Sequence, residues 1–113
     1  MVTHKTTPDF SLEAVHRLAR FKQVEFASSR VHNQLDGPGY SVEDVCDCLQ
    51  ALEEKHFSKS ITYDAGGWMD VYLRQWPAPN RNPPCLDDLY IKLRLNGKCT
   101  SIVIHSFHRE GAL

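Results

Sequence analysis

The chain has 113 residues, a length that supports one hydrophobic core and is too short for two. Apolar residues make up 42% and charged residues 24%, which is typical of a soluble globular protein. No stretch approaches the roughly 20 apolar residues of a membrane span, and residues 1–8 lack the apolar segment of a secretion signal. We therefore expect a single domain over residues 1–113 that stays in the cytoplasm, makes no membrane contact and begins with a flexible N-terminus of about eight residues.

The net charge of −1 gives no argument for binding nucleic acid, but the charge is unevenly distributed. Residues 1–56 hold six Lys or Arg against nine Asp or Glu, a balance of −3, whereas residues 57–113 hold seven against five, a balance of +2. Such an asymmetry can mark an anion-binding half, although a difference of this size also occurs on ordinary solvated surfaces. We expect no direct DNA binding by this chain alone.

The four cysteines do not have the spacing of a metal site. Cys46 and Cys48 are separated by one residue, where zinc motifs use two to four, and no second ligand pair follows at a suitable distance. Both residues fit better as part of a helix. We therefore expect free thiols, no structural metal and no cofactor.

The first half of the chain predicts two short helices. Asp9 or Ser11 can cap a helix over residues 11–21, in which apolar residues recur at helical spacing. Residues 24–26 form a short extended link that could be an edge strand. Ser28 can cap a second helix, which the Gly-Pro-Gly sequence at 37–39 must end.

A third helix is predicted to follow. Ser41 begins a sequence that resembles a capping box, with Asp44 in place of the usual Glu or Gln. The outer face of this helix is acidic, which suits either a docking surface or, more commonly, a solvated helix surface. Its apolar stripe consists of Val42, Val45, Leu49 and Leu52.

From residue 57 the apolar period changes to two, as in β-strands. Four prolines between residues 77 and 84 indicate an exposed loop over 77–86. The strand before it, at 68–76, has Met69, Val71 and Leu73 opposite Trp68, Asp70, Tyr72 and Arg74. In the first strand, at 57–63, the alternation puts four residues on one face: Phe57, Lys59, Ile61 and Tyr63.

Residues 89–95 alternate strictly, and the Asn-Gly pair at 96–97 is a strong hairpin signal. A two-residue loop would place Tyr90 opposite Val103 in the return strand, and a four-residue loop would place it opposite His105. A shift by two positions preserves the side of the sheet. Either register therefore puts the same four residues on one face: Tyr90, Lys92, Arg94 and His105.

Helices first and then a meander of four strands predict an α+β fold. The N-terminal helices should pack on one face of an antiparallel sheet formed by the C-terminal half. The other face should gather basic and aromatic side chains with no carboxylate in the middle of the set, which suits a phosphate-bearing substrate. Its members are Lys59, Tyr90, Lys92, Arg94 and His105.

Common nucleotide-binding, protease and hydrolase motifs are missing from the sequence, namely G-x-G-x-x-G, the P-loop, H-E-x-x-H and G-x-S-x-G. RNA can be cleaved without a metal when its own 2′-hydroxyl attacks the adjacent phosphate. That reaction needs a base, an acid and positive charge at the phosphate, which His, Tyr, Lys and Arg can supply. The same residues also occur as solvated or packing side chains, so composition and spacing leave both interpretations open.

Several segments resemble the motility quorum-sensing regulator (MqsR) family of bacterial toxins, with agreement from about Thr6 to Arg109. The resemblance implies a RelE-like two-layer fold and a type II toxin that acts as a sequence-selective mRNA endoribonuclease. Such a toxin would cleave mRNA at a GCU-type site without a metal and inhibit translation. The resemblance also implies neutralisation by a cognate antitoxin, typically a zinc-containing protein with a helix-turn-helix DNA-binding domain. The segments that carry it are Thr7-Pro8, Leu12, Val15, Leu18, His56 to Thr62, Trp68 to Tyr72, Leu89 to Lys92 and Ser106 to His108.

The resemblance assigns the family's functional lysine to Lys59 and its functional tyrosine to Tyr90. A basic residue near the C-terminus corresponds to His108, and the family's functional glutamine corresponds to Met69, so this chain lacks that polar group. His105 is a second candidate for proton transfer. The candidates for RNA binding are Lys92, Arg94, Arg74 and Tyr72.

Two other functions remain open at this point. One is a non-catalytic RNA-binding or partner-binding module on the same fold, which Met69 and the nearly neutral net charge both favour. The other is a small regulatory protein that acts through the acidic third helix.

Overall fold

The computed structural model describes residues 2–36, 38–63, 66–79 and 82–110. The helices are α1 (Leu12–Arg20), α2 (Ser29–Asp36), α3 (Val42–Gln50) and the short 3₁₀ helix η1 (Glu54–His56). The strands are β1 (Val2–Lys5), β2 (Val24–Phe26), β3 (Phe57–Tyr63), β4 (Trp68–Pro77), β5 (Leu86–Leu95) and β6 (Ile102–Arg109). They form one sheet in the order β1-β3-β4-β5-β6-β2, with antiparallel neighbours except for the parallel pair β2 and β6.

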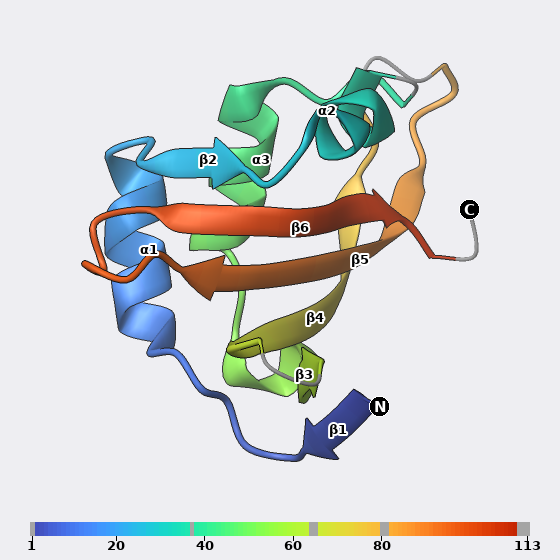
Figure 1. Ribbon diagram of the computed structural model, residues 1–113. Helices are drawn as coiled ribbons and strands as arrows, with labels where there is room; N and C mark the ends of the chain where they lie inside the picture. Colours follow the sequence, from blue (N-terminus) through green and yellow to red (C-terminus); the bar gives the residue numbers. More distant parts are fainter. Residues whose placement is uncertain (1, 37, 64–65, 80–81, 111–113) are drawn as a thin grey trace.

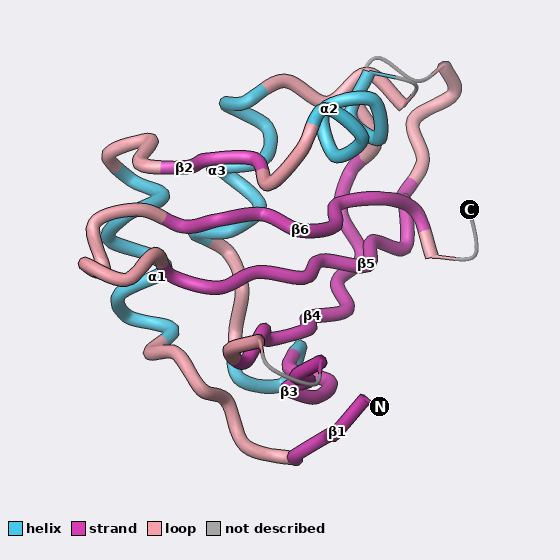
Figure 2. The backbone as a smooth tube through the Cα atoms, in the orientation of Figure 1, coloured by secondary structure: helices cyan, strands magenta, loops and turns pink. Residues whose placement is uncertain are grey.

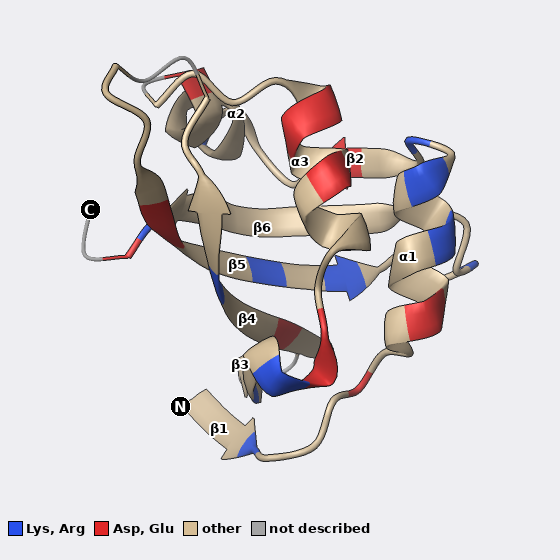
Figure 3. Cartoon of the chain, turned by 180° about the vertical axis from the view of Figure 1, so that it is seen from behind, with Lys and Arg blue, Asp and Glu red and all other residues tan. Residues whose placement is uncertain are grey.

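The α-helices lie on one face of this sheet. α1 and α3 are behind β5 and β6 in Figure 1 and in front of the same strands in Figure 3, where the molecule is turned by 180°. This arrangement confirms the predicted α+β fold, with N-terminal helices packed against a sheet whose four central strands come from the C-terminal half. No helix in the described ranges has both the length and the apolar character that a membrane crossing would need.

The two edge strands come from the N-terminal half (Figure 2). β2 pairs with β6, so residues 24–26 form the edge strand that the sequence suggested. The strand β1 was not predicted, because residues 1–8 were expected to be flexible. Instead Val2–Lys5 pairs along Ser60–Tyr63 of β3.

The predicted helix caps of α1 and α3 are confirmed. Ser11 Oγ accepts a hydrogen bond from the backbone N–H of Ala14 at 3.3 Å. At α3, Ser41 Oγ accepts from Asp44 N–H at 3.1 Å, and the Asp44 carboxylate accepts from Ser41 N–H at 2.9 Å, which completes the capping box. Val42 is an exception to the predicted stripe, since it is 40% exposed at the first turn of α3.

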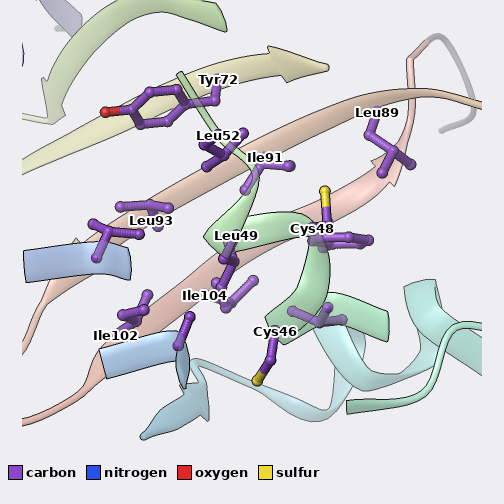
Figure 4. Packing of buried hydrophobic residues seen from close by; sticks show 14 of the residues in the cluster. Cys46, Cys48, Leu49, Leu52, Tyr72, Leu89, Ile91, Leu93, Ile102 and Ile104 are labelled. Carbon is purple, nitrogen blue, oxygen red and sulfur yellow. The ribbon is translucent and has the colours of Figure 1, made fainter. Parts of the chain in front are cut away.

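The main core lies between the helices and the sheet (Figure 4). Both Cys46 and Cys48 are buried in α3, as the helical interpretation of this pair predicted. Burial raises the pKa of the Cys48 thiol to about 12, so this cysteine is an inert packing residue. The strands contribute alternate residues to this core: Tyr72, Leu89, Ile91, Leu93, Leu95, Ile102, Ile104 and Phe107.

Candidate functional site

The candidate site is the sheet face opposite the helices, called the open face below. On β5 this face carries Tyr90, Lys92 and Arg94, because the alternate residues Ile91 and Leu93 are buried under the helices. Two β-bulges decide which residues of the neighbouring strands join it.

The first bulge lies in β3. Phe57 is opposite Tyr72 and Lys59 is opposite Val71, so the register shifts by one between them. The extra residue turns Phe57 toward the helix-side core and Lys59 toward the open face. The prediction that Phe57 and Lys59 share a face was therefore wrong, because strict alternation does not continue through a bulge.

The hairpin between β5 and β6 has neither of the predicted registers. Tyr90 lies opposite His108, not opposite Val103 or His105. The connection is longer than expected because the Asn96 side chain organises it. Its carbonyl oxygen accepts hydrogen bonds from the N–H groups of Thr100 at 2.7 Å and Ser101 at 3.1 Å.

The second bulge is at His105. Leu93 is opposite Ile104 while Lys92 is opposite Ser106, so His105 is the additional residue on β6. Beyond it the side-chain alternation is reversed, and this reversal turns His108 onto the open face. The shared face of Tyr90, Lys92, Arg94 and His105 is as predicted, and the bulge adds His108 to it.

Tyr90 and His108 form a stacked pair on this face. Their ring centroids are 5.2 Å apart with an interplanar angle of 14°. Burial, with a smaller contribution from Tyr63, raises the pKa of Tyr90, so its hydroxyl stays protonated at neutral pH. His108 Nδ1 is 2.8 Å from the backbone carbonyl oxygen of Arg109.

The next row across the sheet joins Lys59, Val71, Lys92 and Ser106 as successive strand neighbours. Lys92 reaches over β4 toward Tyr63 of β3, with 3.4 Å between Lys92 Nζ and the Tyr63 hydroxyl and 5.5 Å between Nζ and the ring centroid. Val71 lies in this row and is fully buried. The two cationic side chains of the row thus stand on either side of an apolar position.

Arg94 and His105 make a third pair. Arg94 Nε donates a hydrogen bond to His105 Nε2 at 3.0 Å. Burial, then the charges of Arg94 and Lys92, lower the pKa of His105. The imidazole is therefore neutral at pH 7. Its Nε2 lone pair is occupied by the hydrogen bond from Arg94 Nε.

The floor of the open face is apolar. Ile61, Met69 and Val71 form a small buried cluster, against which Leu73 and Tyr90 pack. Met69, which corresponds to the family's glutamine, is 9% exposed, so it fills space in this floor and presents little surface.

Two predicted RNA-binding residues lie on the helix side instead. Tyr72 is 1% exposed and meets Phe57 edge-to-face, with centroids 5.7 Å apart. Arg74 Nη1 is 2.7 Å from His56 Nε2, and its guanidinium carbon is 5.4 Å from the Trp76 ring centroid. The structure does not bring either residue to the open face, so we leave both out of the site.

Two residues of the open face were not among the predicted site residues. Tyr63 alternates with Lys59 and Ile61 in β3, so the period of two could have identified it. Ser106 had no such signal, because its side depends on the bulge at His105. Within the described ranges, no cluster of three or more His, Cys, Asp or Glu side chains could hold a metal ion.

Fold and face together define a small α+β protein that presents cationic and aromatic side chains on one face of its sheet, above an apolar floor. A family model described as "Motility quorum-sensing regulator, toxin of MqsA" matches residues 7–109, and the chain belongs to this family. It is therefore a toxin of a toxin–antitoxin system, which implies an antitoxin as partner. A comparison with curated proteins found no match.

Proposed function

We propose that this toxin is an mRNA endoribonuclease that cleaves RNA on its open face without a metal. The observation that supports the proposal is the meeting of Lys59, Tyr90 and His108 on one face. These are the three residues that the resemblance to the family singles out. They come from three different strands, and two bulges are needed to bring them together.

In the proposed reaction the 2′-oxygen of a ribose attacks the adjacent phosphorus. A base accepts the 2′-hydroxyl proton, the bond from phosphorus to the 5′-oxygen breaks, and an acid gives that oxygen a proton. The products are a 2′,3′-cyclic phosphate and a 5′-hydroxyl. Atoms and charge balance without a further reactant.

His108 is the proposed base. A carbonyl oxygen can only accept a hydrogen bond, so the contact with Arg109 places the proton on Nδ1 of the neutral ring and leaves the Nε2 lone pair available. Tyr90 is the proposed donor to the leaving oxygen, because its raised pKa keeps the hydroxyl protonated. The stacked rings hold these two groups side by side.

Lys59 and Lys92 are proposed to stabilise the negative charge that develops on the phosphate. Their strands flank β4, so the phosphate would lie above Val71. We assign His105 to binding and not to proton transfer, since its Nε2 accepts from Arg94 and its lowered pKa keeps it neutral. Arg94, held by this bond, would contact a neighbouring phosphate or base of the RNA.

By the same family resemblance, we propose that cleavage is sequence-selective, occurs in the cytoplasm and inhibits translation. The implied antitoxin partner is proposed to contain zinc and a helix-turn-helix DNA-binding domain. The proposal leaves DNA binding to that partner, because this chain has a net charge of only −1.

The experiment incubates the purified protein with a defined RNA in EDTA and maps the ends of the fragments. The proposal predicts fragments that carry 2′,3′-cyclic phosphate and 5′-hydroxyl ends. Fragments that carry 3′-hydroxyl ends would contradict the proposed reaction, because attack by the 2′-oxygen cannot produce them.

A non-catalytic RNA-binding module is the second candidate, and Met69 is the observation that favours it. A thioether in a buried floor supplies no polar group where the family has a glutamine. This alternative predicts that the same RNA is bound and remains intact at high protein concentration.

A further inference from the structure

A cleft of about 680 Å³ lies on the helix side of the sheet, away from the open face. It is bounded by the linker before α1, the first turn of α1, η1, and the side chains of Phe57 and Tyr72. Its volume is in the range of sites that hold a ligand group. The residues that matter for its chemistry are Asp9, Phe10, Glu13, Glu54, Phe57 and Tyr72.

The charge of the cleft is negative. Asp9 is neutralised by Lys5, whose Nζ is 2.7 Å from the carboxylate. Glu13 and Glu54 have no ion pair with any described residue. Figure 3 shows the acidic segments at the start of α1 and before β3 on the same side of the molecule.

The Tyr72 hydroxyl adds a second, independent feature. Tyr72 is 1% exposed and lines the cleft, yet within the described part of the chain its hydroxyl has no hydrogen-bond partner. In Figure 4 the hydroxyl points away from Leu52 and Ile91, the core residues beside the ring. Burial, and then the charges of Asp70 and Glu54, raise its pKa to about 12. A ligand that hydrogen-bonds to this hydroxyl would therefore gain a contact that no described residue supplies.

We propose that this cleft binds an arginine side chain of a protein partner. A guanidinium group presents several N–H donors in one plane, which suit the carboxylates of Glu13 and Glu54 and the lone pairs of the Tyr72 hydroxyl in the cleft lining. The rings of Phe10 and Phe57 offer apolar surface on which the guanidinium plane and its aliphatic stem pack.

The occupant follows from the charge. Unpaired carboxylates repel the phosphates of RNA, which the proposed function places on the opposite face. The inference goes beyond the proposed function and does not depend on it, because it concerns the other face. The toxin would then use separate faces for RNA and for a basic segment of a protein.

The test is an NMR titration of the intact protein with N-acetyl-arginine amide. Saturable shifts are expected for the signals of Phe10, Phe57 and Tyr72. N-acetyl-citrulline amide has nearly the same shape without the charge, and it should produce no saturable shift. Glu54→Gln should weaken arginine-amide binding about three- to fivefold, as the loss of a partly solvated charge contact does.

The matched control is Asp47→Asn, which makes the same change of charge on the exposed side of α3. It should leave the affinity for arginine amide unchanged. Tyr72→Phe keeps the ring in the core and should also weaken binding.

Equal shifts with both amides, or no saturable shift with arginine amide, would overturn the proposal. The same signals shifting with adenosine and not with arginine amide would assign the cleft to a nucleobase and overturn it as well.

Discussion

At the scale of single residues, the two histidines of the open face differ because their hydrogen-bond partners differ. His105 accepts from Arg94 and is surrounded by positive charge, whereas His108 lies against a carbonyl oxygen and a tyrosine ring. Residue type alone would give both the same role in proton transfer. Their surroundings favour a binding role for His105 and a basic role for His108.

The lowered pKa of His105 predicts a pH dependence of stability. The unfolded state, with a pKa of about 6.5, binds the proton more tightly than the folded state. The contribution of His105 to the free energy of unfolding is therefore fully present above about pH 6.5. This contribution is lost as the pH falls through the folded-state pKa of His105. Urea unfolding measures the free energy of unfolding at about pH 7.5 and at about pH 5.5. The decrease between these two pH values should be smaller in His105→Gln than in the wild type.

His4→Gln is the control, since His4 is an exposed histidine of β1. It should retain the wild-type difference between the two pH values. An identical loss in wild type and His105→Gln would contradict the assignment of a neutral His105.

Tyr90→Phe removes only the hydroxyl and keeps the ring that stacks on His108. The cleavage rate should fall about 100-fold, since the leaving oxygen loses its proton donor. The midpoint of thermal unfolding should change little. Tyr63→Phe, on the same face, is the matched control and should reduce the rate far less, because its ring remains beside Lys92. Comparable losses in both variants would argue against a specific role for the Tyr90 hydroxyl.

At the scale of elements, capping was readable from the sequence and bulges were not. The caps at Ser11 and Ser41 depend on residues three positions away, so a local pattern contains all the information. The bulges at β3 and at His105 depend on which strand lies alongside, which the local sequence does not contain. Sequence therefore predicted the elements but missed the registers.

Ser41→Ala tests the contribution of the α3 capping box. The substitution leaves the backbone N–H of Asp44 without its side-chain acceptor and should lower the free energy of unfolding by about 1 kcal/mol. Urea titration measures this value. Ser58→Ala, an exposed serine of β3, is the control and should stay within about 0.5 kcal/mol of wild type. A Ser41 variant as stable as the control would mean that the cap contributes nothing.

At the scale of the whole molecule, the sheet separates two chemistries. The helix side holds the main core and an acidic cleft, and the open face holds cations, aromatic rings and an apolar floor. The separation was predictable for β4 and β5, where the side chains alternate regularly, and less so for β3, where a bulge interrupts the alternation. Tyr72 and Arg74 lie on the face of β4 opposite Val71, as the alternation predicted, but the sequence does not show that Val71 is the residue beside Lys59.

The most direct test of the central claim compares two lysines in a single-turnover cleavage assay in EDTA. Lys59 lies on the open face, whereas Lys55 is an exposed residue of η1. Lys59→Ala should reduce the cleavage rate at least about 100-fold, because the phosphate loses a charge that stabilises it during reaction. Lys55→Ala should cleave at the wild-type rate. Equal rates for Lys59→Ala and Lys55→Ala would contradict an active site on the open face.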